Sequence, residues 1–276
     1  MTATTLLRQF HAEFVKAQGR GLYQGALGVV LLFAIIPLPV AVSAAFDKDQ
    51  VQWASEIATF PGCLWNTIRI AHLAQGLLVA IVTAGCVGGE YSGGTWKMTL
   101  PRTKARTSAL IAKFLAALVL TLGGLAFMLG FTTAMGAVGS LILGVPFVPG
   151  PVGLGAGEVA RIVAYFAIDF GFVISLAMFA AVLTRSLIGG ALLGYLSQHL
   201  LRALTFLPGG WLSPMTNLDN LQAHWVPQSH FRMADVQAAL GRAVSWQSSV
   251  VTVLVFTAAF CLLSMWLFEK RDLASE

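Results

Sequence analysis

Long apolar runs alternate with short polar segments along most of the chain. Six of these runs are each about 20 residues or longer, which is enough for a helix to cross a bilayer. We therefore predict an all-α, polytopic membrane protein in which one transmembrane domain covers residues 1–276 and six helices span the membrane. The predicted spans are residues 21–45, 68–89, 108–139, 159–183, 187–207 and 246–268.

An amphipathic segment precedes the first span. Residues 3–19 place Leu6, Phe10 and Phe14 at helical spacing, while Arg8 and Lys16 lie elsewhere around the predicted helix. A helix of this kind lies in the membrane interface, with its apolar side toward the lipid. We predict an interfacial helix over residues 3–19.

Prolines and glycines predict irregularities in the spans. Pro37 and Pro39 should kink the first span, because each removes a backbone donor and clashes with the preceding turn. The third span is long and rich in glycine, which allows either one long tilted helix or a helix broken near its outer end. We expect a polar outer loop at residues 47–66, a Pro- and Gly-rich outer loop at residues 144–157, and an extracytoplasmic segment at residues 208–245 with a short helix over 233–244.

Charge sets the orientation of these spans. Only 29 of the 276 residues are charged (17 Lys and Arg, 12 Asp and Glu), and the basic ones gather beside the apolar runs. This placement favours membrane orientation over nucleic-acid binding, and the side richer in Lys and Arg is the cytoplasmic one. That side holds 11 basic residues (Arg8, Lys16, Arg20, Lys97, Arg102, Lys104, Arg106, Lys113, Arg185, Lys270 and Arg271) against six on the other (Lys48, Arg69, Arg161, Arg202, Arg232 and Arg242), so both termini are predicted to be cytoplasmic.

The densest charge lies between the second and third spans, in residues 87–114. Gly88 and Gly89 would let the backbone leave the membrane sharply, and Ser92 or Thr95 could cap a short helix. The basic surface that follows could dock into a groove of a partner protein. The alternative is that these charges only obey the positive-inside rule and contact lipid phosphates.

A family resemblance bears on this choice. Residues 89–95 (GEYSGGT), then Lys97 and Leu100, basic residues, and residues 110–114 (LIAKF) resemble the loop between the second and third helices of ABC-2-type permeases, the membrane subunits of ATP-binding-cassette exporters. Phe268 with Arg271 and Asp272 is similar to that family's C-terminal ending. The interfacial helix, six spans and long outer segment match its layout over essentially the whole chain.

The resemblance implies an exporter subunit of a bacterial or archaeal plasma (inner) membrane, working as a dimer with a second copy or a homologue. A separate ABC ATPase subunit would dock on residues 90–107 and bind ATP and Mg. This chain contains no G-x-x-x-x-G-K-[ST] motif, so we expect it not to be an ATPase. Replacing Glu90 or residues 94–98 should uncouple ATPase stimulation while leaving membrane insertion intact. The coupling residues are Gly89, Glu90, Tyr91, Gly94, Thr95, Trp96, Lys97 and Met98.

Polar residues inside the spans indicate a substrate pathway. Asp169 is the only acidic residue deep within a span, where a charge is costly and is either a functional contact or a structural hydrogen bond. Two further sets share helix faces through spacings of three and four, and together they are net basic, as would suit an anionic or zwitterionic group. The alternative for these sets is snorkelling at the interface. They are Arg69, His72 and Gln75 on the second span, and Gln198, His199 and Arg202 on the fifth.

Other function classes fit the sequence less well. A membrane scaffold or a maturation or immunity factor with the same fold but no transport stays open. An intramembrane enzyme is disfavoured, because Asp169 has no second carboxylate or His at catalytic spacing, and we predict no catalytic residue. We also predict no cofactor or metal site in this chain, since Cys63, Cys86 and Cys261 lack metal-ligand spacing. Gly190 and Gly194 form a small-xxx-small pair that would let two helices approach closely.

Overall fold

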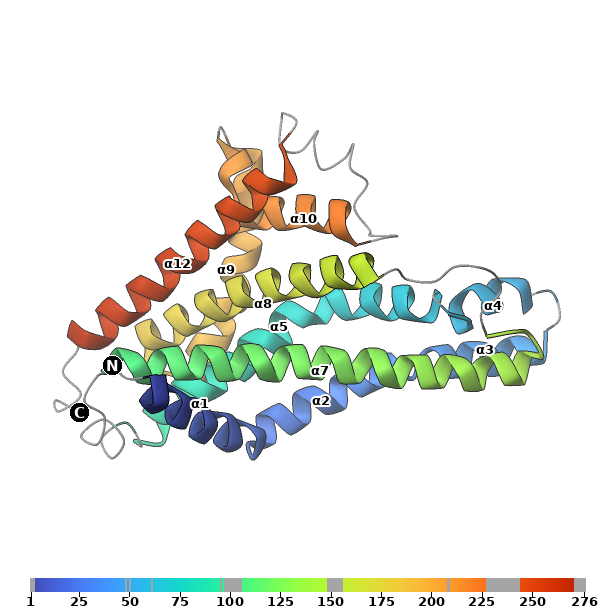
Figure 1. Cartoon of the computed structure of the whole chain (residues 1–276), viewed down its shortest axis with the longest axis horizontal. Helices are drawn as coiled ribbons and strands as arrows, with labels where there is room; N and C mark the ends of the chain where they lie inside the picture. The colour runs from blue at the N-terminus through green and yellow to red at the C-terminus, as the bar shows by residue number, and fades with distance from the viewer. Residues whose placement is uncertain are drawn as a thin grey trace.

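The computed structural model describes residues 3–47, 49, 51–60, 62–94, 96, 106–147, 156–207, 209–226 and 244–270 (Figure 1). Every regular element in these ranges is helical, which confirms the predicted all-α class. The elements are α1 (Ala3–Gln18), α2 (Gly21–Ala34), α3 (Pro37–Ala45), α4 (Val51–Ala58), α5 (Gly62–Ser92), α7 (Arg106–Leu143), α8 (Ala156–Thr184), α9 (Leu187–Ala203), η3 (Leu204–Phe206), η4 (Gly210–Leu212), α10 (Pro214–Trp225) and α12 (Trp246–Lys270).

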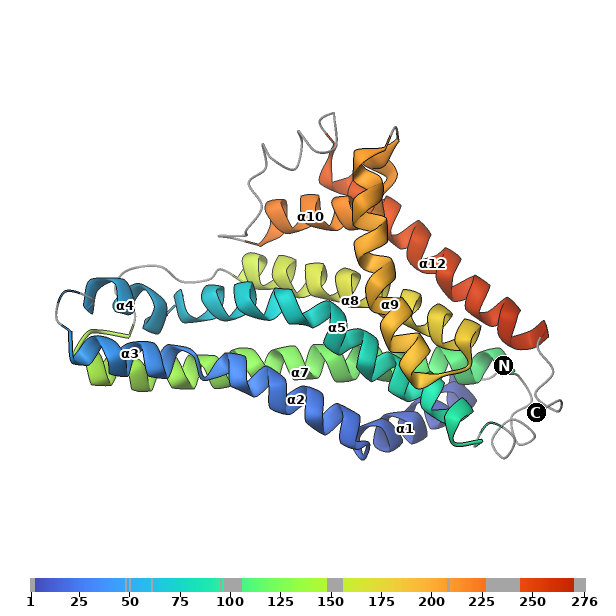
Figure 2. The same cartoon turned by 180° about the vertical axis from the view of Figure 1, so that it is seen from behind.

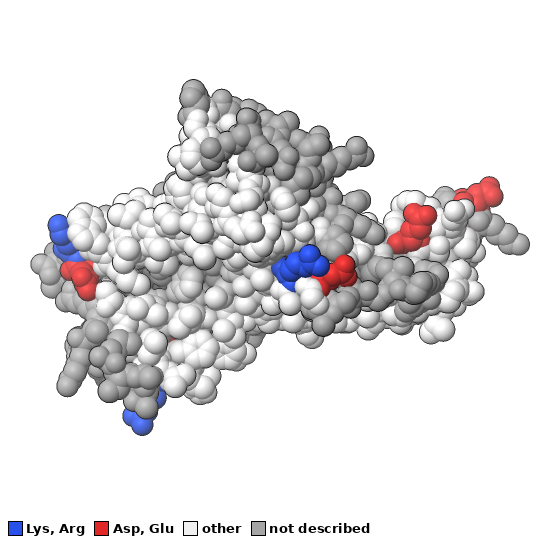
Figure 3. All heavy atoms as spheres, turned by 45° about the horizontal axis from the view of Figure 1, so that its top comes forward, with Lys and Arg blue, Asp and Glu red and all other residues white. Residues whose placement is uncertain are grey.

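Four helical stretches of the described chain are long and apolar enough to cross a membrane: Gly21–Ala45, Thr107–Leu143, Gly157–Thr184 and Trp246–Lys270. They indicate a multi-pass membrane protein. Figure 3 shows one face of the molecule, where charged side chains of the described residues occupy only a few separate spots among uncharged ones. A surface of this kind is suited to lipid rather than to water.

The predicted kink in the first span is confirmed. The helix ends as α2 at Ala34 and resumes as α3 at Pro37, with two turn residues between them. Pro37 occupies the first turn of α3, where backbone N–H groups have no partner within the helix, so that the missing N–H of proline is tolerated.

The third predicted span is one unbroken helix, α7, which resolves the alternative that the sequence left open. Its 38 residues correspond to about 57 Å at 1.5 Å per residue, more than the roughly 40–45 Å of a whole bilayer. The end of α7 therefore projects beyond the membrane or tilts strongly within it. Figures 1 and 2 show α3 and α4 beside this end.

Helix α8 forms the centre of the molecule. Within an apolar stretch of 18 residues, 78% of the α8 residues are buried, against 11% in the corresponding stretch of α12. Helices α5 and α7 run beside α8, whereas α9 and α12 slant away and hold α10 between their far ends (Figures 1 and 2). The main hydrophobic core gathers Tyr165, Phe166 and Phe172 of α8 with residues of α5, α10 and α12.

Two predicted loops contain helix instead. The segment 47–66 holds α4 and the first turn of α5, and the segment 208–245 holds α10, which the sequence analysis did not predict. Polar side chains of α10 explain this omission: Asn217 and Asn220 look like loop residues, but both are buried and hydrogen-bond to Ser249 of α12. The predicted helix over 233–244 lies, except for Val244, outside the described residues.

The close approach predicted at Gly190 and Gly194 is confirmed, and the helix that approaches is α8. A Cβ atom added at Gly190 would lie 2.8 Å from Ala181 Cα, and one at Gly194 would lie 2.9 Å from Ala177 Cα. Both distances are too short for real side chains. The tight turn before α9 aids this contact, because Ser186 caps the helix by accepting a hydrogen bond from the Gly189 amide.

Replacing Gly194 by alanine is expected to lower the free energy of unfolding by about 1–3 kcal/mol, because the new methyl group forces α9 away from α8. Thermal unfolding in detergent measures this loss. The matched control is Gly123→Ala in α7, where nothing lies within 4 Å of an added Cβ. That variant should be as stable as the wild type or more stable by up to about 1 kcal/mol through helix propensity. Equal stability of the two variants would contradict the prediction.

Candidate functional site

Five charged side chains meet where the first half of the chain folds back on itself. We call Glu13, Lys16, Arg20, Glu90 and Lys113 the ion cluster. Glu90 Oε1 lies 2.8 Å from Lys113 Nζ and 3.5 Å from Arg20 Nη2, and it also pairs with Lys16. Lys113 in turn pairs with Glu13. The cluster therefore joins α1 and the start of α2 to the end of α5 and the start of α7.

The centre of the ion cluster is shielded from solvent. The side chains of Glu90 and Lys113 are each 1% exposed. Burial raises the pKa of Glu90, but the charges of Lys113 and Lys16 and their hydrogen bonds outweigh it, so the pKa lies below its ordinary value of 4.5. Glu90 is therefore ionised at neutral pH, and it needs its basic partners because an uncompensated buried charge is strongly destabilising.

An aromatic group packs against the ion cluster. The ring of Trp96 lies 4.7 Å from that of Phe268 and 5.7 Å from that of Tyr91, measured between centroids. Lys113 Nζ lies 5.1 Å from the centroid of the Trp96 ring, which is within cation–π range. Phe268 stands at the end of α12, so the last described helix is tied to the same place.

This arrangement corrects part of the predicted docking surface. Glu90 and Trp96 are buried, so their side chains hold the ends of the segment and cannot themselves contact a partner. The predicted sharp exit at Gly88 and Gly89 is wrong, because α5 stays helical to Ser92 and the left-handed turn comes at Gly94 (φ +63°). A Cβ at Gly88 would lie 2.6 Å from the Ser186 carbonyl oxygen, so this glycine serves close packing against the turn before α9.

The remaining coupling residues have varied positions. Gly89 is partly buried in α5 with Arg20 beside it, since an added Cβ would lie 3.3 Å from Arg20 Nη1. Tyr91 is half-buried, and Gly94 is exposed. Thr95, Lys97 and Met98 lie outside the described residues.

A second site lies between α5, α8 and α9. A hollow of about 640 Å³, including its open mouth, brings together five of the seven residues predicted for a substrate pathway. We call it the polar hollow. The side chains of the other two, Arg69 and His72 of α5, are not described. The polar hollow is lined by Gln75, Gly76, Val79, Asp169, Phe170, Val173, Tyr195, Gln198, His199, Arg202 and Met215.

Hydrogen bonds between helices shape the polar hollow. Gln75 Nε2 of α5 donates to Asp169 Oδ2 of α8 at 2.8 Å. Gln198 Nε2 of α9 donates to the carbonyl oxygens of Gly76 at 3.3 Å and Gly194 at 3.1 Å. Asp169 and Gln198 are both buried, so these bonds replace the water that each polar group has lost.

Charges at the mouth of the polar hollow are balanced. Arg202 Nη2 lies 2.7 Å from Asp219 Oδ1 of α10. Burial raises the pKa of Asp219 to about 6, against the lowering effect of Arg202. Asp169 and Asp219 thus bring two carboxyl groups to the place that holds Arg202, while the side chains of Arg69 and His72, which belong to the set predicted to be net basic, are not described.

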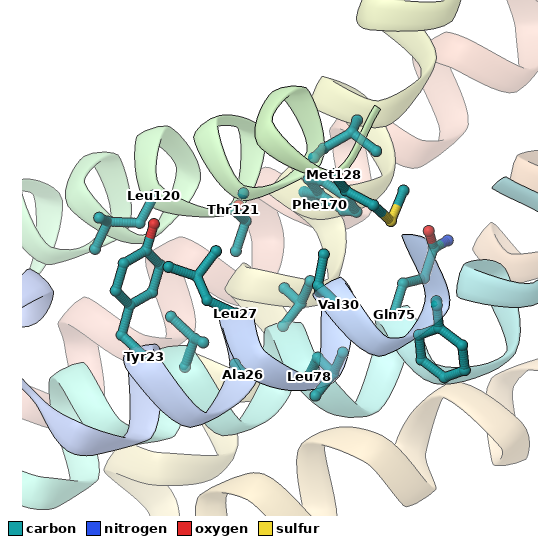
Figure 4. A pocket seen from close by; sticks show the side chains of 15 residues that line it. Tyr23, Ala26, Leu27, Val30, Gln75, Leu78, Leu120, Thr121, Met128 and Phe170 are labelled. Atoms are coloured by element: carbon teal, nitrogen blue, oxygen red, sulfur yellow. The ribbon is translucent and has the colours of Figure 1, made fainter. Parts of the chain in front are cut away.

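A second, apolar hollow of about 590 Å³ adjoins the polar one. We call it the apolar hollow. Side chains of α2 face those of α7 across it, and Figure 4 shows Tyr23 and Gln75 at its opposite ends. Gln75, Val79 and Phe170 line both hollows. Its lining is Tyr23, Ala26, Leu27, Val30, Phe33, Gln75, Leu78, Val79, Val82, Leu120, Thr121, Gly124, Leu125, Met128 and Phe170.

Sequence reasoning missed several members of these sites. Glu13, Lys16 and Arg20 follow at spacings of three and four, a signal that could have indicated one charged side along α1 and its end. Asp219 gave no comparable signal, because its partner Arg202 lies on another helix. In the described chain, moreover, no group of three or more His, Cys, Asp or Glu could hold a metal ion.

Comparison with known protein families gives a match over most of the chain. The profile of a family described as a protein of unknown function (DUF2705) matches residues 31–274. No curated protein matches the chain.

Proposed function

The chain belongs to the DUF2705 family, and we propose that it is the permease subunit of an ABC transporter, an exporter driven by a separate ATPase subunit that docks on residues 90–107. One observation carries this proposal: a single helix, α5, holds Glu90 in the ion cluster and Gln75 in the polar hollow. These residues are 15 positions apart, about 22 Å along the helix. A displacement of one end of α5 is therefore transmitted to the other.

The ion cluster suits such a coupling role. It fixes the end of α5 and the start of α7, which flank the basic segment, to α1. The Trp96–Phe268 contact adds α12. A partner pushing on residues 97–105 would thus move four helices together, since charged pairs and close-packed rings resist separation.

The polar hollow suits the transport role. Polar pockets lined by helices of an apolar bundle mark substrate routes in membrane proteins, because unneeded polar groups there are costly. The proposal includes six crossings, with α5 and α9 added to the four apolar stretches, and both termini in the cytoplasm. In its support, α9 returns along α8 after a two-residue turn, so if α8 crosses the bilayer α9 crosses back.

The test reconstitutes the chain with a co-purifying protein that carries the G-x-x-x-x-G-K-[ST] motif and measures ATP hydrolysis. Reversing two charges of the docking segment, with Lys97→Glu and Lys104→Glu together, should reduce stimulation about tenfold or more, because like charges then face the partner. The matched control is Arg161→Glu, an exposed residue at the start of α8, which should leave stimulation unchanged.

Stimulation that is absent in the wild type, or unchanged by the double reversal, would overturn the ATPase-driven permease. The scaffold or maturation-factor alternative predicts stimulation without movement of any substrate into liposomes. From the resemblance to ABC-2-type permeases, we further propose that the chain forms a dimer with a second copy or a homologue.

A further inference from the structure

The two hollows adjoin each other and have contrasting linings. Gln75, Val79 and Phe170 stand between them and line both. The apolar half is walled by α2, α5 and α7, and its polar side chains are few: Tyr23, Gln75 and Thr121. The other half presents Asp169, Gln198, His199 and Arg202.

We propose that this joined site binds a single-chain amphiphile with a zwitterionic head group, and, resting on the proposed function, that such a molecule is the transported substrate. The chain of the amphiphile would lie among Leu27, Leu125 and Met128, and its head group among Asp169, His199 and Arg202.

Charge in the polar hollow selects the head group. Asp169 is buried on the α8 side and Arg202 stands on α9, so the hollow offers a carboxyl group as well as a guanidinium group. Asp219 offsets Arg202 at 2.7 Å, and a second anion brought there by an acidic head group would meet two carboxylates as well as one guanidinium. A head group with an ammonium and a phosphate can place each beside its opposite. Electrostatic complementarity of this kind determines specificity more than affinity.

The apolar hollow selects the chain. Its depth from Tyr23 to Gln75 follows α2 for several turns, as Figure 4 shows, and an elongated cavity favours an extended chain over a compact ring system. Gly124 is buried on the α7 wall, where an added Cβ would be in ordinary contact, 3.7 Å from Leu27 Cδ2. This position therefore allows the hollow to be filled by mutation without a backbone clash.

The test uses the purified chain alone, in a maltoside detergent, with a lysophosphatidylethanolamine that carries a diazirine halfway along its acyl chain. After irradiation, peptide mass spectrometry locates the label. We expect labelling at Leu27, Thr121 or Met128. Gly124→Leu should reduce it about fivefold or more, because the new side chain occupies the hollow. Gly123→Leu is the matched control, since this neighbouring position is exposed with nothing within 4 Å of its Cβ, and labelling should be unchanged.

Thermal unfolding shows whether Gly124→Leu is folded. If that variant unfolds, Gly124→Ala is used instead, because a single methyl group fits the space without a clash. It should reduce labelling about twofold, since the methyl group fills a smaller part of the hollow. Competition then tests the head group: unlabelled lysophosphatidylethanolamine should compete at least about tenfold better than lysophosphatidic acid.

Label spread equally over lipid-facing residues of α12 and the hollow, or equal labelling of the Gly123 and Gly124 variants, would overturn the site. Equal competition by the anionic lipid would overturn the zwitterionic head group. These outcomes are separable from failure of the proposed function, because labelling needs no ATPase. Labelling without ATPase stimulation leaves a lipid-binding protein that is no permease, and stimulation without labelling leaves a permease for another substrate.

Discussion

Glu90→Gln should lower the free energy of unfolding by about 3–5 kcal/mol, the usual cost of breaking a buried ion pair by removing one partner. Glutamine keeps the shape of the side chain, but Lys113 then keeps Glu13 as its one remaining carboxylate in the ion cluster. Lys16 and Arg20 lose the carboxylate of Glu90 as an ion-pair partner. The amount of folded protein in the membrane should fall accordingly.

The measurement is thermal unfolding of the purified variant in detergent, together with its abundance in membranes. Glu56→Gln is the matched control, because Glu56 is exposed on α4 and its replacement should change stability by no more than about 0.5 kcal/mol. If Glu90→Gln is as stable as this control, the ion cluster contributes nothing to the stability of the fold.

Acid gives a second measure of the same contribution. The pKa of Glu90 is lowered in the folded protein, so the folded state binds a proton less readily than the unfolded chain does. Stability from Glu90 is therefore fully present above its ordinary value of 4.5 and is lost as pH falls through the lower, folded value. The stability difference between wild type and Glu90→Gln should thus shrink below pH 4.5 and stay constant between pH 5 and 7.

Asp169→Asn should leave the fold intact and raise the half-saturating concentration of the lysophosphatidylethanolamine probe about tenfold or more, the loss of one hydrogen bond to a charged group. Asparagine can still accept the hydrogen bond that Gln75 donates at 2.8 Å, so α5 and α8 should stay joined. The second carboxyl oxygen of Asp169, which we propose as the contact of the ammonium group, is replaced by an NH2 group. Photolabelling at a series of probe concentrations measures the shift.

Asp169→Leu separates binding from folding. Leucine cannot accept a hydrogen bond, so this variant should lose abundance as well as binding, because the Gln75 amide loses its acceptor. Normal binding by Asp169→Asn would contradict a functional contact, and reduced abundance of that variant would indicate that Asp169 is structural.

The transmembrane character of the chain could be predicted because it depends on local sequence. Neighbouring residues alone indicate three features: the apolar stretches of sufficient length, the break before Pro37, and the glycines of α9 that contact α8. The predicted spans accordingly resemble the observed helices, though α5 begins earlier, at Gly62, and α7 ends later, at Leu143.

The candidate site was predicted in part. Gln75, Gln198, His199, Arg202 and Asp169 stood out because polar residues are rare in apolar spans, and they do line one hollow. Nothing in the sequence indicated the apolar hollow, because its leucines, valines and phenylalanines look like any residues that face lipid or other helices. Asp219 was also missed because it lies in α10, a helix whose asparagines are typical of a loop although they are buried.

The segment of residues 87–114 shows which features cannot be predicted from neighbouring residues alone. By itself, the sequence determined that residues 87–114 join two helices and are rich in charge. Only the tertiary structure decided that Glu90 turns inward to residues 70 or more positions away in α1 and at the start of α2, and that Trp96 packs on Phe268. Helices α5 and α7 are apolar around most of their circumference, so no hydrophobic stripe fixes their rotation. That rotation, and with it the partner of each charge, is set by packing between helices.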